Sequence, residues 1–233
     1  MSGAAALVSA PSPDMLRYAL FDLDNTLYPA DSGLWEAIGE RIGLYMTERM
    51  RLPPAEAASI RRRYLKAFGT TLNGLRLEYD IDPLDYLGYV HDLPLASYLR
   101  PQPALDAMLA RLPLVKVVFT NADASHAWRV LDQLGIRRHF THIIDILALD
   151  FVNKPDPLAY RRALDLLAAA PSECLFVEDT ARNLLPAHDL GMQTVLVGPA
   201  SDERGVDFHI PDILELETIV GRGLPPAGST LPS

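Results

Sequence analysis

Short apolar segments alternate along the chain with longer segments of helical periodicity. Most of the short segments are apolar almost throughout, as expected for strands covered on both faces of a sheet. They span residues 16–23, 114–120, 141–146, 174–177 and 193–197. Helical patterns lie between them at residues 103–112, 124–134, 157–168 and 181–190. This alternation predicts βαβ units, a parallel sheet and an α/β fold with a Rossmann-like core.

One gap between the predicted strands is much longer than a crossover requires. About a dozen residues or somewhat more are enough to connect parallel strands, but residues 29–98 follow the first strand before the core resumes. We therefore assign residues 15–28 and 99–220 to the α/β core and residues 29–98 to an inserted helical cap. Because the insertion begins where the first strand ends, we expect the cap to lie over the carboxyl edge of the sheet.

The sequence of the insertion predicts a small helical bundle. Asp31 or Ser32 is a suitable N-cap for its first helix, and a second helix follows the Pro-Pro pair at 53–54. Two shorter helical segments span residues 72–79 and 83–90. Apolar residues recur every three or four positions in the first two helices, at Trp35, Ile38, Ile42 and Tyr45, then at Ile60, Tyr64 and Phe68.

Both ends of the chain lack such patterns. We expect residues 1–14 and 221–233 to be disordered tails, the second of them because it is rich in Gly, Pro and Ser. The first basic side chain is Arg17, so the start has no basic region typical of a cleaved signal peptide.

Composition narrows the possible partners. The 233 residues suffice for one large domain or for a core with a smaller inserted domain. A formal net charge of −9 disfavours a nucleic-acid polymer, because no basic surface dominates. The basic run at residues 61–63 spreads around its helix, where it forms a solvated face or weakly steers anionic substrates.

Cysteine content and apolar run length bear on the compartment. Cys174 is the only cysteine, which excludes an intrachain disulfide and suits a reducing, cytoplasmic location. Its apolar neighbours indicate a buried side chain rather than a thiol nucleophile. No apolar run approaches the roughly 18 residues that span a bilayer, so we expect no membrane partner.

Polar side chains follow the predicted strands where each strand ends. Because the carboxyl ends of parallel strands meet at one edge of a sheet, we expect these side chains to converge there. They are Asp22 and Asp24 after the first strand, Thr120 and Asn121 after the second, Lys154 before the helix at 157–168, and Glu178 and Asp179 after the strand at 174–177.

These residue types suit attack on a phosphate. A carboxylate such as Asp22 can be the nucleophile and form an aspartyl-phosphate. Neighbouring carboxylates repel each other and need a cation, and Mg²⁺ takes few carboxylates together with waters and phosphate oxygens. Asp179 offers further oxygen ligands, and Lys154 offers a positive charge to the transferred group. Thr120 can donate a hydrogen bond to a phosphoryl oxygen, helped by the amide of Asn121.

Together the four motifs resemble the haloacid dehalogenase-like (HAD) hydrolase superfamily. They occur in its order, as FDLDNTLY at 21–28, FTN at 119–121, KP at 154–155 and VED at 177–179, and the match covers about residues 17–197. The inserted helices are similar to the cap that this superfamily carries between its first two motifs.

The resemblance implies a role for each residue. Asp22 is the nucleophile, Asp24 the general acid/base, Thr120 a phosphate ligand, and Lys154 a partner of both Asp22 and the phosphoryl group. Asp22, Asp179 and the main-chain oxygen of Asp24 would hold Mg²⁺. Glu178 would act through a water, and Asn183 matches the trailing polar residue of the fourth motif.

Asp24 distinguishes the branches of this superfamily. Its dehalogenases lack an acid two residues after the nucleophile, because a halide leaves without a proton. A phosphomonoester leaves as an alkoxide, and an acid at that position speeds its departure by about 10²–10⁴-fold. The presence of Asp24 favours a phosphatase.

A finer resemblance concerns the pyrimidine 5′-nucleotidase group of the superfamily. Residues 21–34 (FDLDNTLYPADSGL), 64–75 (YLKAFGTTLNGL) and the FTNA form of the second motif carry it. It places the segment with Thr70, Thr71 and Asn73 against the substrate. The other interpretation is a helix-connecting turn that Thr70 or Thr71 caps. Asn73 stands where some relatives have arginine, which bears on selectivity for nucleobase or sugar.

Other candidates are weaker. Tyr28 and Trp35 could stack on a nucleobase or simply pack within the cap. The histidines show no metal-ligand spacing, although His126 follows the second motif and could line the site. There is no Walker loop or dinucleotide fingerprint, which leaves an NTPase or a dehydrogenase unsupported.

Three functional hypotheses follow. The first is a Mg²⁺-dependent phosphomonoesterase acting on nucleoside 5′-monophosphates such as UMP and CMP, with small sugar or acid phosphates as rival substrates. The second is a phosphomutase of the same fold, which returns the phosphoryl group to a sugar. The third is a phospho-accepting signalling protein, which the length of the chain and its helical insertion disfavour.

Overall fold

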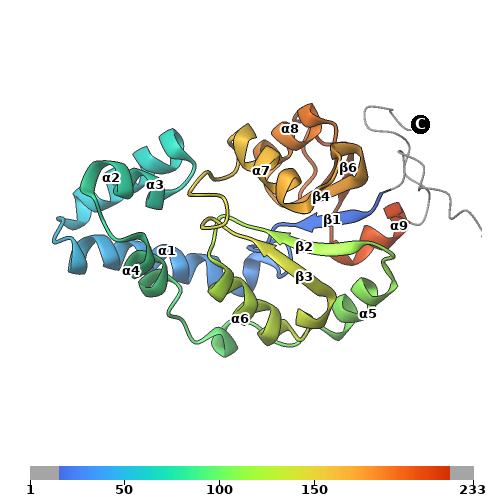
Figure 1. Cartoon of the computed structure of the whole chain (residues 1–233). Helices are drawn as coiled ribbons and strands as arrows, with labels where there is room; N and C mark the ends of the chain where they lie inside the picture. The colour runs from blue at the N-terminus through green and yellow to red at the C-terminus, as the bar shows by residue number, and fades with distance from the viewer. Residues whose placement is uncertain (1–15, 221–233) are drawn as a thin grey trace, which may run out of the picture.

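A six-stranded parallel sheet forms the centre of the molecule (Figure 1). Its strand order is β3-β2-β1-β4-β5-β6, and each neighbouring pair is parallel. The strands are β1 (Tyr18–Phe21), β2 (Val115–Phe119), β3 (Phe140–Ile144), β4 (Cys174–Glu178), β5 (Gln193–Val197) and β6 (Phe208–Ile210). This confirms the predicted α/β fold with a Rossmann-like parallel sheet.

The computed structural model describes residues 16–220, so both predicted tails lie outside the described range. Within residues 16–220, none of the helices combines the length and the hydrophobicity needed to cross a bilayer.

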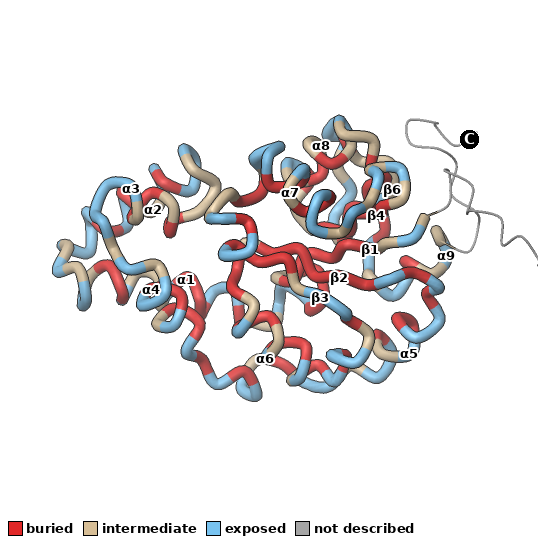
Figure 2. The backbone as a smooth tube through the Cα atoms, viewed as in Figure 1, coloured by how far each residue is buried: buried red, intermediate tan, exposed pale blue. Residues whose placement is uncertain are grey.

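Strands β1 to β5 divide their side chains between two apolar cores, one on each face of the sheet. In β1, Ala19 and Phe21 belong to one core and Leu20 to the other. Helices α5 (Pro103–Arg111) and α6 (Ala124–Leu134) cover the first face, and α7 (Pro157–Leu167) and α8 (Ala181–Leu190) cover the second. A short α9 (Leu216–Val220) packs with the first core. Because both faces are covered, the central strands are buried (Figure 2), which explains their unbroken apolar sequence.

Four helices between β1 and α5 lie beside the carboxyl edge of the sheet (Figure 1). They are α1 (Leu34–Leu44), α2 (Pro54–Phe68), α3 (Thr71–Tyr79) and α4 (Pro83–Val90), and a π-helical turn, Tyr45–Arg49, extends α1. Their own apolar cluster includes Tyr64, Leu75 and Ile146, the last from a loop of the sheet domain. The first turns of α1 contribute Leu34 and Ile38 to the main core instead, so this helix joins the two parts.

Two local features differ from the sequence-based expectations. The first helix of the insertion begins after Gly33, whose φ of 78° suits glycine, so neither Asp31 nor Ser32 is the N-cap residue. Residues 30–32 form a 3-10 turn before it, and the Ser32 hydroxyl accepts a hydrogen bond from the Leu34 amide at 3.3 Å. The edge strand β6 was not predicted, because three residues are too few to show a period.

Gly74 allows α2 and α3 to pack closely. A Cβ at this position would lie 2.2 Å from Cγ of the fully buried Tyr64 ring. We expect Gly74→Ala to destabilise the protein by about 1–3 kcal/mol through overpacking, despite its better helix propensity. Thermal unfolding should then show a Tm lowered by several degrees.

Gly43→Ala in α1 is the matched control, because a Cβ there meets no atom within 4 Å. It should leave Tm unchanged or raise it. An unchanged Tm for Gly74→Ala would show that the contact between α2 and α3 adapts without cost.

Candidate active site

The predicted site residues meet at the carboxyl edge of the sheet, where β1 and β4 lie side by side. Asp22 follows β1, and its amide donates to Val177 O of β4 at 2.9 Å. Thr120 follows β2, and its amide donates to Ile144 O at 3.0 Å. The chain reverses its winding direction between β1 and β4, and open α/β sheets bind ligands outside such a point.

A buried ammonium group joins two carboxylates at the centre of the site. Lys154 Nζ lies 2.6 Å from Asp22 Oδ1 and 2.8 Å from Glu178 Oε2, and all three side chains are almost completely buried. The ammonium also lies over the rings of Phe119 and Phe176, with its nitrogen 5.2 and 5.1 Å from the centroids. The three charged groups therefore sit in an environment with little water to screen them.

Burial dominates the ionisation of this group. It raises the pKa of Asp22 to about 7, with the negative charges of Glu178 and Asp24 adding to the effect and Lys154 opposing it. Burial likewise raises the pKa of Glu178 to about 7. For Lys154 burial acts downward, but the two carboxylates outweigh it and raise its pKa to about 12. The carboxylates thus exceed what one lysine neutralises, and the site favours a further cation.

A trio of acidic residues fits such a cation. Asp22, Glu178 and Asp179 each offer an oxygen, and these oxygens all lie within 4.8 Å of one another. Oxygen ligands and few carboxylates suit Mg²⁺. The sequence-based set named Asp24 in place of Glu178. The Asp24 carboxylate lies outside this trio, and the role proposed for its main-chain oxygen stays a prediction.

Asp24 has a hydrogen-bond donor and a histidine ring next to its carboxylate. The Tyr28 hydroxyl donates to Asp24 Oδ1 at 2.5 Å, and His126 Nε2 lies 3.8 Å from the same oxygen. Burial acts to raise the pKa of Asp24, but His126 and Tyr28 outweigh it and leave that pKa lowered. Burial and the Asp24 charge raise the pKa of Tyr28, which keeps its hydroxyl a donor. Asp24 therefore favours the ionised form where Asp22 does not.

Thr120 and Asn121 lie at the sheet edge as predicted, but their side chains make different contacts. The buried Thr120 hydroxyl accepts a hydrogen bond from the Ala122 amide at 3.0 Å. The Asn121 side chain binds the main chain of Lys154, accepting from its amide at 2.8 Å and donating to its carbonyl at 3.1 Å. Both residues line the cavity above the sheet edge, and Asn121 also holds the lysine loop in position.

The cap covers this site and leaves a cavity of about 280 Å³. Thr70 and Thr71 line it, and Thr70 also caps α3 by accepting from the Asn73 amide at 3.3 Å. The Asn73 side chain is not part of the lining, because its amide donates to Phe151 O at 2.7 Å and to Asn153 Oδ1. Asn73 thus anchors the cap to the loop that carries Lys154.

Two residues near the site, Asn153 and His91, were not predicted from the sequence to lie there. Asn153 donates to its neighbour Lys154 O at 2.6 Å and contacts the cap through Asn73. His91, immediately after α4, lines the cavity and pairs with Asp123. Their sequence signals were weak, since neither lies at the end of a predicted strand. Trp35 lines the cavity from the cap, whereas Tyr28 is buried in the main core and its hydroxyl donates to Asp24.

Known proteins of one hydrolase family are similar to this chain. Residues 16–191 match the family described as haloacid dehalogenase-like hydrolase. Phosphate metabolism protein 8 of Saccharomyces cerevisiae is 28% identical over 202 residues, which make up 80% of this chain and 63% of that protein. The chain therefore spans less than two thirds of that relative. Glyceraldehyde 3-phosphate phosphatase of Methanopyrus kandleri is 28% identical over 231 residues, or 88% of this chain and 97% of that protein.

A solved structure of similar fold is the L-2-haloacid dehalogenase of Xanthobacter autotrophicus, with a TM-score of 0.58 and 19% identity over 91% of this chain and 100% of that chain. At that identity the likeness concerns the fold alone. The family match, by contrast, covers most of residues 16–220 and includes all four motifs that meet at the sheet edge. The chain belongs to the haloacid dehalogenase-like hydrolase family.

Proposed function

We propose that the protein is a Mg²⁺-dependent phosphatase that hydrolyses small phosphomonoesters through an aspartyl-phosphate on Asp22. The buried contact between Lys154 and Asp22 carries this proposal, because it fixes a carboxylate beside a positive charge at the sheet edge. Asp24, two residues further on and held by Tyr28, supplies the acid that a phosphate ester needs and a halide does not. The name of the Methanopyrus relative, a phosphatase, also supports it.

In the first step an oxygen of Asp22 attacks phosphorus, and the bond from phosphorus to the ester oxygen breaks. Lys154 stays beside the reacting carboxylate and offsets charge on the phosphoryl group. Asp24 gives a proton to the departing oxygen, so that an alcohol leaves. Because an anionic phosphoryl group raises the pKa of a nearby carboxyl group, substrate binding favours the protonated form of Asp24.

In the second step Asp24, now ionised, takes a proton from a water molecule. The water oxygen bonds to phosphorus while the bond between phosphorus and Asp22 breaks. Inorganic phosphate leaves, Asp22 is again a free carboxylate, and Asp24 is again protonated. Asp24 thus acts first as an acid toward the leaving group and then as a base toward water, and both aspartates return to their starting forms.

The trio Asp22, Glu178 and Asp179 would hold the Mg²⁺. When bound, the ion supplies positive charge that favours the ionised form of Asp22 and offsets charge on the phosphoryl oxygens. Contacts within the protein position the remaining groups: Lys154 binds Asp22, Tyr28 binds Asp24, and Asn121 binds the main chain of Lys154.

For the substrate, we propose a nucleoside 5′-monophosphate of the UMP or CMP type. The cap side of the cavity supports it, since the half-exposed Trp35 and the buried Tyr86 provide aromatic surface and Arg61 provides donors. The cap motif similar to pyrimidine 5′-nucleotidases contributes Thr70 and Thr71 to the same wall. Small sugar or acid phosphates are the rival class, which the name of the Methanopyrus relative favours. A phosphomutase would use the same first step.

Phosphate release from UMP, CMP, AMP, GMP, glycolate phosphate and hexose phosphates, with Mg²⁺ and with EDTA, tests the proposal. We expect turnover with Mg²⁺, its loss with EDTA, and a preference for UMP and CMP. Equal rates over the set would keep the phosphatase and remove the nucleotidase assignment. No turnover of any compound would contradict the proposed function and favour the phosphomutase or the phospho-accepting signalling protein.

Asp22→Asn removes the nucleophile but keeps the size of the side chain. We expect kcat to fall by at least about 10³-fold, since the amide cannot form the aspartyl-phosphate. Asp165→Asn, an exposed site on α7, is the matched control and should retain full activity. A kcat for Asp22→Asn within tenfold of wild type would show that another group attacks phosphorus.

Asp24→Asn separates proton donation from attack. Hydrolysis of an alkyl phosphate should slow by about 10²–10⁴-fold, because its alkoxide must be protonated. Hydrolysis of p-nitrophenyl phosphate should slow less in the first step, since that leaving group needs little help. Single-turnover rates of phenol or alcohol release measure this step. Equal losses on both substrates would count against Asp24 as the acid.

A further inference from the structure

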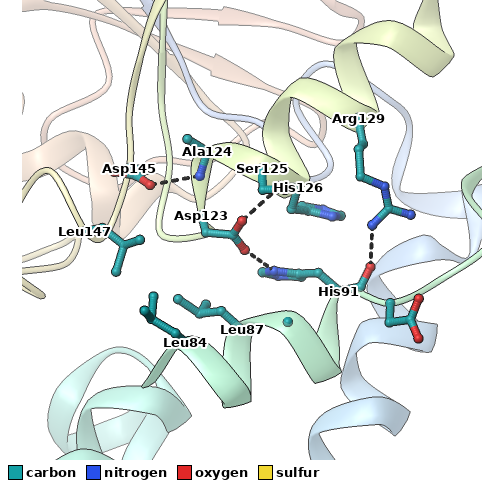
Figure 3. Close-up of a pocket in the computed structure, with 12 residues that line it drawn as sticks. Leu84, Leu87, His91, Asp123, Ala124, Ser125, His126, Arg129, Asp145 and Leu147 are labelled. Atoms are coloured by element: carbon teal, nitrogen blue, oxygen red, sulfur yellow. Dashed lines mark hydrogen bonds and ion pairs between the residues drawn. The ribbon is translucent and has the colours of Figure 1, made fainter. Parts of the chain in front are cut away.

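Figure 3 shows a pair of histidines, His91 and His126, where the cap chain returns to the sheet domain, and His126 lies close to Asp24. His91 follows α4 directly, and His126 lies in the first turn of α6. Their rings stack with centroids 4.1 Å apart and planes 16° from parallel. The pair lies beside the catalytic aspartate, but the reaction proposed above leaves both histidines without a function.

His126 is an unusual buried group. His126 is 1% exposed to solvent, and within residues 16–220 neither of its ring nitrogens has a hydrogen-bond partner. Burying an unsatisfied polar group costs free energy, so packing alone favours an apolar ring at this position. Its Nε2 nevertheless lies only 3.8 Å from Asp24 Oδ1, slightly beyond hydrogen-bond range. A small approach of the two side chains would make the bond.

The surroundings hold the His126 ring in place. Asp123 accepts from the His126 main-chain amide at 3.0 Å, and its other oxygen lies 2.5 Å from His91 Nδ1. Arg129 donates to the carbonyls of His91 at 2.9 Å and Leu93 at 2.8 Å. Figure 3 shows Asp123 beside the two rings and Arg129 at the far side. Charged groups of Asp123, the N-cap residue of α6, and of Arg129 in α6 therefore hold the chain that leaves the cap against the start of this helix.

The oxygen that His126 approaches is also informative. Tyr28 donates to Asp24 Oδ1, the same atom that lies nearest His126 Nε2. Two groups directed at one carboxylate oxygen orient the carboxylate and leave Oδ2 for proton exchange with the substrate. We propose that His126 is a positioning residue for Asp24, with His91 and Asp123 keeping its ring in register. This inference rests on the proposed function of Asp24.

The same stack separates two cavities. His91 and Leu87 line both the cavity above Asp22 and a second cavity, of about 400 Å³, between α4 and α6. His126 lines only the second. The rings thus form a wall behind Asp24, and a polar ring there can act on the carboxylate without touching the substrate.

The test compares His126→Phe with His126→Gln on two substrates, an alkyl phosphate and p-nitrophenyl phosphate, followed as single-turnover leaving-group release. Phe keeps a ring for the stack and removes the donor, and Gln keeps a donor. We expect His126→Phe to slow alkyl release by about tenfold or more and p-nitrophenol release by less than about threefold. His126→Gln should recover at least part of the alkyl rate.

A double-mutant cycle with Asp24→Asn makes the test specific. If His126 acts through Asp24, His126→Phe should add less than about twofold to the loss already caused by Asp24→Asn. His142→Phe, at an exposed position of β3, is the control and should leave both rates unchanged. Tm of each variant verifies the fold, and His126→Gln carries the test if the Phe variant does not fold.

Equal losses on the two substrates, or a full additional loss in the Asp24→Asn background, would overturn the positioning role. The proposed function fails in a different way. If wild type releases neither leaving group, or if Asp24→Asn affects both substrates equally, the assignment of Asp24 itself is wrong.

Discussion

The structure depends on one constraint, which is the burial of the Lys154 ammonium between Asp22 and Glu178. An unpaired charge in this environment would cost several kcal/mol, so each of the three groups requires the others. Asp22 directly follows β1, Glu178 ends β4, and Lys154 lies in the loop before α7. Because β1 and β4 are neighbours in the sheet, their carboxyl ends bring the two carboxylates together. Because one lysine does not neutralise the carboxylates around it, the same constraint that orders the site also favours a divalent cation.

The loop with Lys154 also links the charged residues at the sheet edge to the cap. Asn121 holds its main chain from the sheet side, and Asn153 connects it to Asn73 of α3. Gly69 approaches it so closely that a Cβ there would lie 3.1 Å from Lys154 O and 2.5 Å from Nδ2 of Asn153. The turn with Thr70 is thus placed by contacts to the lysine loop. A displacement of the cap would have to break these contacts or move the lysine loop with it.

Sequence patterns were most informative where local chemistry decides the structure. The bounds of α4, α6, α8 and β5 were predicted as observed, because periodicity, proline or glycine mark their ends. The position of Asp22, Thr120 and Lys154 at the sheet edge was predicted because each follows or precedes a regular element there. Asn73 was placed against the substrate, whereas its amide binds the loop of Lys154, a contact between residues 80 positions apart. The pairing of His91 with Asp123, 32 positions away, is likewise a tertiary contact, and no pattern in one sequence reveals it.

Asp22 and Asp24 show how two identical side chains, two residues apart, acquire different chemistry. Asp22 faces Glu178 and Lys154 in a buried site that raises its pKa, whereas Tyr28 and His126 surround Asp24 and lower its pKa. The partner proposed for each aspartate acts on its pKa in the opposite direction to these surroundings. A cation among Asp22, Glu178 and Asp179 favours an ionised nucleophile, and a phosphoryl anion beside Asp24 favours a protonated acid. The free site therefore disfavours the ionised form of Asp22 and favours that of Asp24, and metal and substrate together would shift each aspartate toward the form that its proposed role requires.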